Sequence, residues 1–418
     1  MRVSDRFLLN EYVRNMNRTK TQMSNLQEKI TTGKSINKPS DSPLGASRIM
    51  RLSSQMGDVS TYKANIGEAG SSINGAISSM TGIQTEIQKV MSDLTSVNNP
   101  TLGNNITSYA KKIDTSLNQI LDLANSDFNG QYLFGGTDLS TKPYALNGSG
   151  NSVDINSQAV GGERKIRISK NIDQKINMTG KELFQSVLTQ SGTLDSTAAG
   201  GSTTSTSKTV YDSDGNQYTF AINYQKDASA ANTYNISYTL DDGSGSGPQS
   251  VGSTNTAVFD SSTGELKTID GNDPKDIHIQ ANSNKVDFVV DFSSMKEGTT
   301  NSISSDLSQK TNIFNTLLSI KKNLANGTLP NQNQIAIVND FNQHILNKLS
   351  VAGDISNRLT STSQLLDNQN LELKNLKSQE SDVDVVKTMV ELQSKQLNLQ
   401  TGYKISAMIL PKSLVDFL

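Results

Sequence analysis

The chain of 418 residues contains no cysteine and no tryptophan. The absence of cysteine excludes disulfide bonds and thiolate chemistry, and it leaves an oxidising environment tolerable without demonstrating one. Hydrophobic residues make up only 34% of the chain and aromatic residues 5%. Such a composition fits thin, elongated bundles and polar strands better than a thick globular core. The net charge of −2 gives no overall attraction to nucleic acid or acidic membranes.

Long apolar runs are also missing. No stretch is apolar and long enough to cross a bilayer, and residues 1–20 contain no apolar run of signal-peptide length. Taken by itself, this pattern predicts a cytoplasmic protein without membrane insertion.

The familiar catalytic and metal-binding motifs are absent as well. The two histidines, His278 and His344, lie in different predicted domains, and strand alternation makes His278 a solvent-facing residue. No His-Glu-x-x-His zinc helix, Gly-x-Ser-x-Gly elbow or dinucleotide-binding loop occurs. Asp212, Asp214 and Asn216 hint at a calcium loop, but the spacing lacks further ligand positions, so a turn is the better interpretation. We therefore expect no enzyme activity, no cofactor and no metal.

What the chain does have is long heptad patterning. Between Val59 and Val97, apolar residues follow one another at alternating steps of three and four. This pattern predicts a helix that packs along other helices, about 58 Å long at 1.5 Å per residue. A second long helix is predicted between Ile335 and Leu376, and a shorter one over residues 102–128.

Both ends of the chain carry narrower seams of the same kind. We expect these seams to be the surfaces through which subunits assemble. The N-terminal seam consists of Leu9, Tyr12, Met16, Met23, Leu26 and Ile30, and the C-terminal seam of Val385, Met389, Leu392, Leu399, Tyr403 and Leu410.

Each terminal helix is separated from the long helices by a break. On the N-terminal side the break runs from Gly33 to Pro43, and its Gly-Lys-Ser triplet is not a phosphate loop, since Glu28 stands where the first glycine belongs. Two prolines restrict their neighbours to extended conformations, and Ser42-Pro43 is a helix N-cap and first-turn pair. We expect a rigid linker between layers, formed by Pro39, Ser40, Asp41 and Pro43. Residues 378–382 form the matching C-terminal break.

The middle of the chain changes to a period of two. Residues 165–178 alternate like a β-hairpin, followed by a short helix over 180–188. From residue 191 to 301 the composition shifts to Ser, Thr, Gly, Asn and Asp, with short alternating runs between turn clusters. These runs predict an all-β domain, inserted as an outward appendage.

Together these patterns predict an α+β fold: an elongated, layered subunit with a long antiparallel coiled-coil helical bundle built from both termini and an inserted all-β domain. We assign residues 1–40 and 378–418 to an inner terminal-helix layer that is mobile in the monomer. Residues 41–190 and 302–377 form the long helical bundle with its β-hairpin, and residues 191–301 form the outer β domain.

These residues resemble the flagellin superfamily at both ends of the chain. Residues 37–43 are similar to the Pro-Ser-Asp-x-Pro signature of the hook–filament junction branch of that superfamily. Residues 128–136 resemble the end of the family's third helix, and residues 413–418 resemble the ending of the junction branch. Flagellins usually carry an Asp-Asp-Ala-Ala-Gly type run where this chain has residues 41–45. Residues 191–301 show no such resemblance.

The resemblance implies a structural subunit of the bacterial flagellum that joins hook to filament and assembles as a ring. It implies export by the flagellar type III apparatus, which cleaves no signal peptide, and so reverses the cytoplasmic expectation. The implied partners are copies of the same chain, a hook-associated protein on the hook side, flagellin or another protein on the filament side, and an export chaperone on the C-terminal helix. Two alternatives stay open: flagellin itself, or an adhesin-like binding role for the inserted β domain.

Overall fold

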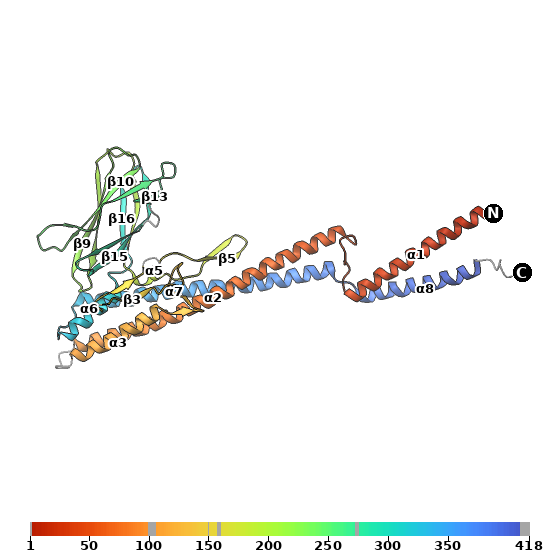
Figure 1. The fold of residues 1–418 in the computed structure, drawn as a ribbon, viewed down its shortest axis with the longest axis horizontal. Coiled ribbons are helices and arrows are strands. Elements are labelled where there is room, and N and C mark those ends of the chain that lie inside the picture. Colours follow the sequence, from red (N-terminus) through yellow and green to blue (C-terminus); the bar gives the residue numbers. More distant parts are fainter. Residues whose placement is uncertain (1, 99–105, 149, 157–159, 272–275, 410–418) are drawn as a thin grey trace. The chain divides into compact units, whose positions relative to one another are not determined.

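The fold is α+β in a computed structural model that describes residues 2–98, 106–148, 150–156, 160–271 and 276–409. Long helices come from both ends of the chain, and the strands lie between them in sequence (Figure 1). The chain divides into two compact units. Unit 1 comprises residues 1–65 and 361–418, and unit 2 comprises residues 66–360.

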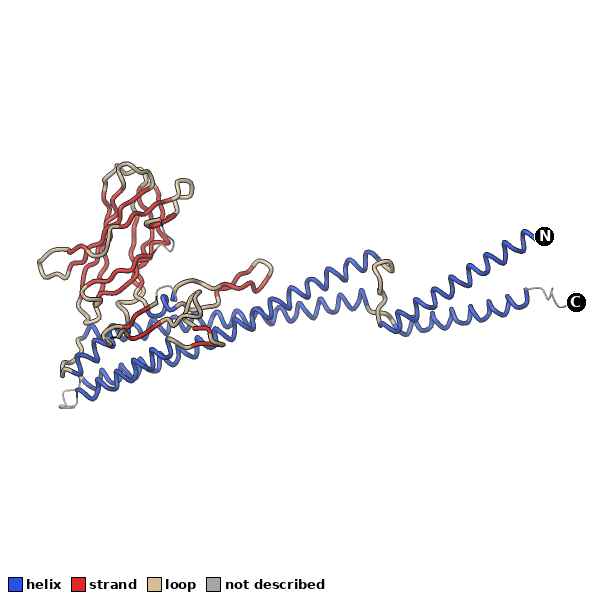
Figure 2. Tube along the Cα trace, in the orientation of Figure 1, coloured by secondary structure: helices blue, strands red, loops and turns tan. Residues whose placement is uncertain are grey.

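The described residues of unit 1 are helical apart from its linkers (Figure 2). It contains α1 (Arg2–Thr32), α8 (Val385–Ile409), and the linker-proximal ends of α2 (Pro43–Val97) and α7 (Gln332–Ser381). The helices α1 and α8 lie side by side, since the Tyr12 hydroxyl donates a hydrogen bond to the carbonyl of Gly402.

In unit 2 the predicted heptad seam of α2 forms the helical core. From Ile66 to Val97 every third or fourth side chain along the seam is buried, and Ile73, Met80, Ile83, Ile87 and Val90 are fully enclosed. The other helices of the bundle are α3 (Ile106–Ala124), α6 (Ile313–Ala325) and the first part of α7. The helix α3 ends at Ala124, before the predicted 128, because residues 125–132 turn back in the two-residue strands β1 (Asp127–Phe128) and β2 (Gln131–Tyr132). The predicted residues 102–105 lie outside the described ranges.

Small β elements and the short helix α5 cover the helices of unit 2. They are β3 (Tyr144–Leu146), β4 (Val153–Ile155), β5 (Lys165–Ser169), β6 (Ile172–Lys175) and α5 (Gly180–Phe184). The predicted hairpin is the antiparallel pair β5–β6, and the predicted short helix ends earlier, at Phe184. A cluster of aromatic rings joins these elements to α6 and α7, and its ring centres lie 5.1 to 6.2 Å apart: Phe134, Tyr144, Phe184, Phe314 and Phe341.

The inserted β domain consists of two facing sheets. One has the order β13-β12-β10-β9-β8, with β11 paired to β10, and the other has the order β14-β15-β7-β16. The strands are β7 (Val187–Asp195), β8 (Thr203–Tyr211), β9 (Gln217–Lys226), β10 (Thr233–Asp241), β11 (Gln249–Ser250), β12 (Asn255–Phe259), β13 (Leu266–Ile269), β14 (Asp276–Ala281), β15 (Val286–Gly298) and β16 (Ser302–Leu307).

The two sheets bury a shared core in which alternate residues point inward, as period-two patterning requires. The ring of Phe220 packs edge-to-face on Phe288 with centroids 4.8 Å apart. The pairing of β15 with β7 is parallel, whereas the other ladders are antiparallel. The strands of the inserted β domain begin at Val187 and end at Leu307. The domain thus extends a few residues beyond the predicted 191–301 at each end.

Candidate functional site

The two breaks near the chain ends pair with each other. Gly33 ends α1 with a φ of +68°, a left-handed conformation that glycine adopts without strain. The next residues run beside the end of α7. The amide of Ser35 donates a hydrogen bond to the carbonyl of Ser381 at 2.7 Å, and the amide of Val383 donates one to the carbonyl of Gly33 at 3.1 Å. We call residues 33–43 and 378–384 together the paired linker.

Side chains reinforce this backbone contact. The ammonium of Lys34 lies 2.7 Å from the carboxylate of Asp382, which also accepts hydrogen bonds from Ser378 and Ser381. These hydrogen bonds, that from Lys34 first, hold the pKa of Asp382 well below its ordinary value of 3.8. Both partners of the ion pair are about half exposed, 46% each, so water weakens the pair and the backbone bonds carry the contact.

The predicted linker residues form a tight turn. Pro39, Ser40, Asp41 and Pro43 are all exposed. The carboxylate of Asp41 accepts the backbone amides of Asn37 and Lys38, each at 2.9 Å, and these bonds lower the pKa of Asp41. The turn is thus held by its own acid as well as by its prolines.

The start of α2 packs closely against the rest of the paired linker. As the Ser42-Pro43 pair predicts, the hydroxyl of Ser42 caps α2 by accepting the amide of Gly45 at 3.2 Å. A Cβ on Gly45 would overlap the end of the Ile36 side chain and would lie 3.1 Å from a carboxylate oxygen of Glu380. Only a glycine permits this approach without movement of Ile36.

The predicted seam of α1 faces α8. The side chains of Tyr12, Met16, Met23, Leu26 and Ile30 are all partly buried, whereas the side chain of Leu9 lies outside those that the structure describes.

The predicted seam of α8 is only half covered. Leu392 and Leu399 are partly buried with Gly402 on the side that meets α1. Val385, Met389 and Tyr403 are exposed by 43 to 54%, and Leu410 lies outside the described residues.

The helix α8 carries a second apolar stripe, which lies outside the predicted heptad seam. Val386, Val390 and Leu397 are 62 to 76% exposed. At 100° per residue these three side chains point about 120° away from Val385 around the helix. A prediction that follows only one apolar seam along α8 therefore assigns them to its polar face. The signal was present in the sequence, because α8 has apolar residues on two sides.

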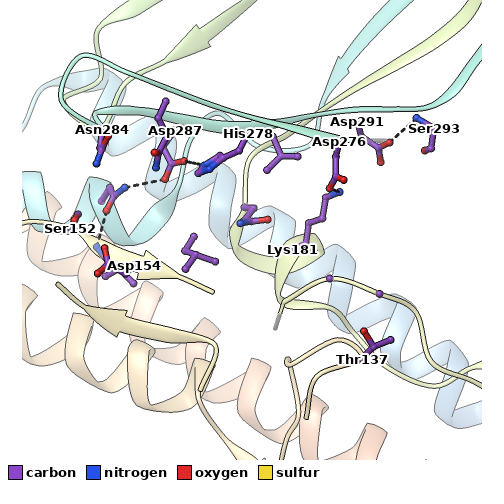
Figure 3. A pocket seen from close by; sticks show the side chains of 18 residues that line it. Thr137, Ser152, Asp154, Lys181, Asp276, His278, Asn284, Asp287, Asp291 and Ser293 are labelled. Atoms are coloured by element: carbon purple, nitrogen blue, oxygen red, sulfur yellow. Dashed lines mark hydrogen bonds and ion pairs between the residues drawn. The ribbon is translucent and has the colours of Figure 1, made fainter. Parts of the chain in front are cut away.

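Unit 2 contains the polar cleft shown in Figure 3, of about 970 Å³. Within it, Nε2 of His278 lies 2.6 Å from the carboxylate of Asp287, and Lys181 pairs with Asp276 at 2.5 Å. The imidazole of His278 is about half exposed, so strand alternation predicted its orientation but not its partner. His344 is bonded through Nε2 to the carbonyl of Glu182 at 2.8 Å, and burial lowers its pKa.

The described residues contain no cluster of three or more His, Cys, Asp or Glu placed to hold a metal ion. None of the helices in the described ranges has the length and apolar character needed to cross a membrane. The turn at Asp212–Asn216 closes on itself, because Asp212 accepts the amides of Asp214 and Asn216 at 2.9 and 2.8 Å.

Comparison with known families matches three regions. Residues 3–138 match the bacterial flagellin N-terminal helical region, and residues 335–418 match the bacterial flagellin C-terminal helical region. Residues 171–343, which include the inserted β domain, match the flagellar basal body protein FlaE D2 domain. All three families are of flagellar proteins.

The individual relatives have low sequence identity to this chain. Flagellar hook-associated protein 3 of Escherichia coli (strain K12) is 27% identical over 191 residues, 45% of this chain and 58% of that protein. The protein of the same name from Salmonella typhimurium is 26% identical over 195 residues, with the same coverage. The aligned part thus spans less than two-thirds of these relatives. The crystal structure of the flagellar junction protein FlgL from Legionella pneumophila is 18% identical, with a TM-score of 0.46 over 80% of this chain and 99% of that chain.

The two flagellin regions lie where the structure has its long helices, before and after the strands of the inserted domain. The chain belongs to the flagellin superfamily.

Proposed function

We propose that this chain is a structural subunit of the bacterial flagellum that joins hook to filament. It is exported by the flagellar type III apparatus and assembles as a ring through the surfaces of its terminal helices. Its neighbours are copies of itself, a hook-associated protein on one side, and flagellin or another filament-side protein on the other. The similarity to two hook-associated proteins 3 supports this role over that of flagellin.

One observation carries the assembly part of the proposal. Fourteen of the twenty large apolar side chains that are exposed in the described part of the chain lie in unit 1, although unit 1 holds less than a third of the residues. Exposed apolar side chains in such a concentration mark a surface that another protein covers. Because the subunits are identical and each can bind the next through this apolar surface, a closed ring covers the surface on every copy.

Two features of α8 support an export chaperone as a further partner. One side of α8 meets α1, and the stripe of Val386, Val390 and Leu397 remains exposed on another. An amphipathic helix with spaced apolar anchors is the form that a hydrophobic groove on a partner binds. The same stripe is then available to a chaperone before export and to a neighbouring subunit afterwards.

Deletion of the gene tests the junction role directly. We expect electron microscopy of the deletion strain to show hooks without filaments, with unpolymerised flagellin in the medium, and complementation to restore filaments. Normal filaments would refute the role. Flagellin is distinguished by copy number, because flagellin dominates a purified filament whereas a junction subunit is a trace band.

A further inference from the structure

The turn at residues 212–216 projects from the β domain toward two helices. Asp212 is 1% exposed and organises the turn by accepting two of its backbone amides. This leaves the carbonyl groups of Ser213, Asp214 and Gly215 pointing outward as acceptors. Gly215 has a φ of +80°, and a Cβ there would lie 2.6 Å from the side-chain oxygen of Asn331. The turn is therefore shaped to fit against the start of α7.

Three amide side chains at the start of α7 bind these carbonyls. Asn331 donates to Asp214 at 2.6 Å, Asn333 to Gly215 at 2.8 Å and Gln334 to Ser213 at 3.2 Å. Asn331 also caps α7, since its side-chain oxygen accepts the amide of Gln334 at 2.8 Å while Gln334 bonds back to the amide of Asn331. The same residues thus cap the helix and hold the β domain.

A second contact repeats this arrangement at α6. Asn312 caps α6 by accepting the amide of Phe314 at 3.0 Å, and its amide nitrogen donates to the carboxylate of Asp287 on β15 at 3.2 Å. Asp287 is buried and also accepts from Asn315 at 3.4 Å and pairs with His278 (Figure 3). The carboxylate also lies at the N-terminus of a helix, where the partial positive charge of the helix favours an anion.

We propose that these two contacts form a cap clamp, a device that fixes the β domain to the N-terminal caps of α6 and α7 so that it moves with these helix starts as one body. Without it, the domain would be joined to the helices by two adjacent chain crossings, at Ser186 and Ser308, and by the side-chain contacts of Lys181 with Asp276 and of Ser319 with Asp214. A connection through one small region ordinarily permits domain motion. Ser186 bonds to the carbonyl of Gln309 at 2.6 Å, so the crossings form one narrow neck. The clamp adds two attachment points away from this neck.

The clamp gives the inserted domain a mechanical role that a flexible appendage lacks. A force on the β domain acts on the first turns of α6 and α7 through side chains, not through a linker. Since α7 begins at Gln332, directly after its cap, displacement of the cap by the β domain displaces the start of the helix itself. This inference stands on contacts within unit 2 and does not depend on the assembly that the chain forms.

The test uses amide-to-hydroxyl substitutions that keep both helix caps. Asn312→Ser, Asn331→Ser and Asn333→Ser together remove three of the five bridging amide donors and leave those of Gln334 and Asn315. Serine remains a good N-cap at 312 and 331. Each lost hydrogen bond should favour the detached form by about fivefold. The matched control is Asn357→Ser with Asn368→Ser, two exposed asparagines of α7.

The absence of native cysteine allows specific spin labels at Ser253→Cys in the β domain and Lys111→Cys on α3, both exposed. We expect a narrow distance distribution in the parent and control chains by electron–electron double resonance, and a broader one in the triple variant. Slow amide exchange at Ile222 and Ile236 must persist, which shows that the domain is still folded. A parent distribution as broad as that of the triple variant, or a triple variant as narrow as the parent, would overturn the clamp.

Discussion

Replacement of the second apolar stripe of α8 should disable assembly without unfolding the monomer. The perturbation is the triple variant Val386→Ser, Val390→Ser and Leu397→Ser. Serine and valine have similar helix propensities, and the three side chains make little contact in the monomer, where they are 76, 62 and 63% exposed. The α1-facing residues of α8 are left untouched.

The magnitude follows from the exposed fractions. Full burial of a valine or leucine side chain stabilises by about 1.5–3 kcal/mol. Since roughly two-thirds of each side chain remains to be buried, the triple variant should lose about 3–6 kcal/mol of assembly free energy for each interface. That loss corresponds to a weakening of about 10²- to 10⁴-fold in the dissociation constant.

The assay measures how a deletion strain complemented with each variant distributes the chain between purified hook–filament preparations and the medium. We expect the triple variant in the medium and the parent chain at the flagellum. Glu391→Ser with Asn398→Ser, on the polar side of α8, is the matched control. Circular dichroism of the purified monomers should be the same for all three chains.

Two results would refute this reasoning. Incorporation of the triple variant at the level of the parent chain would show that the stripe stays exposed in the flagellum. Equal loss in the control would show that α8 tolerates no change of any kind, so that the apolar stripe has no special role. If the variant is not exported at all, quantification inside the cell detects it, and the chaperone contact then becomes the affected step.

Four further outcomes are expected. Deletion of residues 187–308 with a short Gly-Ser linker should leave a folded, exported chain that supports swimming, because Val187 and Ser308 are hydrogen-bonded neighbours. Deletion of residues 191–301 should instead lower the yield of folded chain, since it cuts β7 and removes β15 beside it. Because burial lowers the pKa of His344, the stability that its neutral form contributes is complete above pH 6.5 and declines below it. The free energy of unfolding of His344→Gln, measured by chemical denaturation, should therefore fall less steeply below pH 6.5 than that of the parent chain. An equal fall in both chains would contradict the assignment. Pro39→Ala with Pro43→Ala should leave secretion intact and weaken filaments under shear, with motility in viscous medium as the readout; unchanged motility would count against it. In the free monomer about forty residues at each end should exchange amide hydrogens quickly, because narrow terminal helices with one partner do not offset an ordering entropy of roughly 1–2 kcal/mol per residue; protected termini beside a protected α2 would refute this.

Local periodicity determined much of this fold. The heptad seam of α2 is buried as predicted, because one apolar stripe at helical spacing leaves a single way to exclude water. The breaks at Gly33 and near Asp382 and the period-two runs of the β domain were equally local, since each depends on a glycine, a proline or an alternation read within a few residues. The helix cap at Ser42 belongs to the same class.

Contacts between distant residues were decided only by the tertiary structure. The rotation of α8, which turns Leu392 toward α1 and leaves Val390 exposed, depends on which stripe the partner helix covers, and both stripes are apolar in the sequence. The parallel pairing of β15 with β7 joins residues about a hundred positions apart, for which period-two alternation gives a face but no register. In the same way, asparagines at helix starts predict caps, but that Asn312 and Asn331 also hold the β domain follows only from where the folded chain places Asp287 and the turn at Gly215.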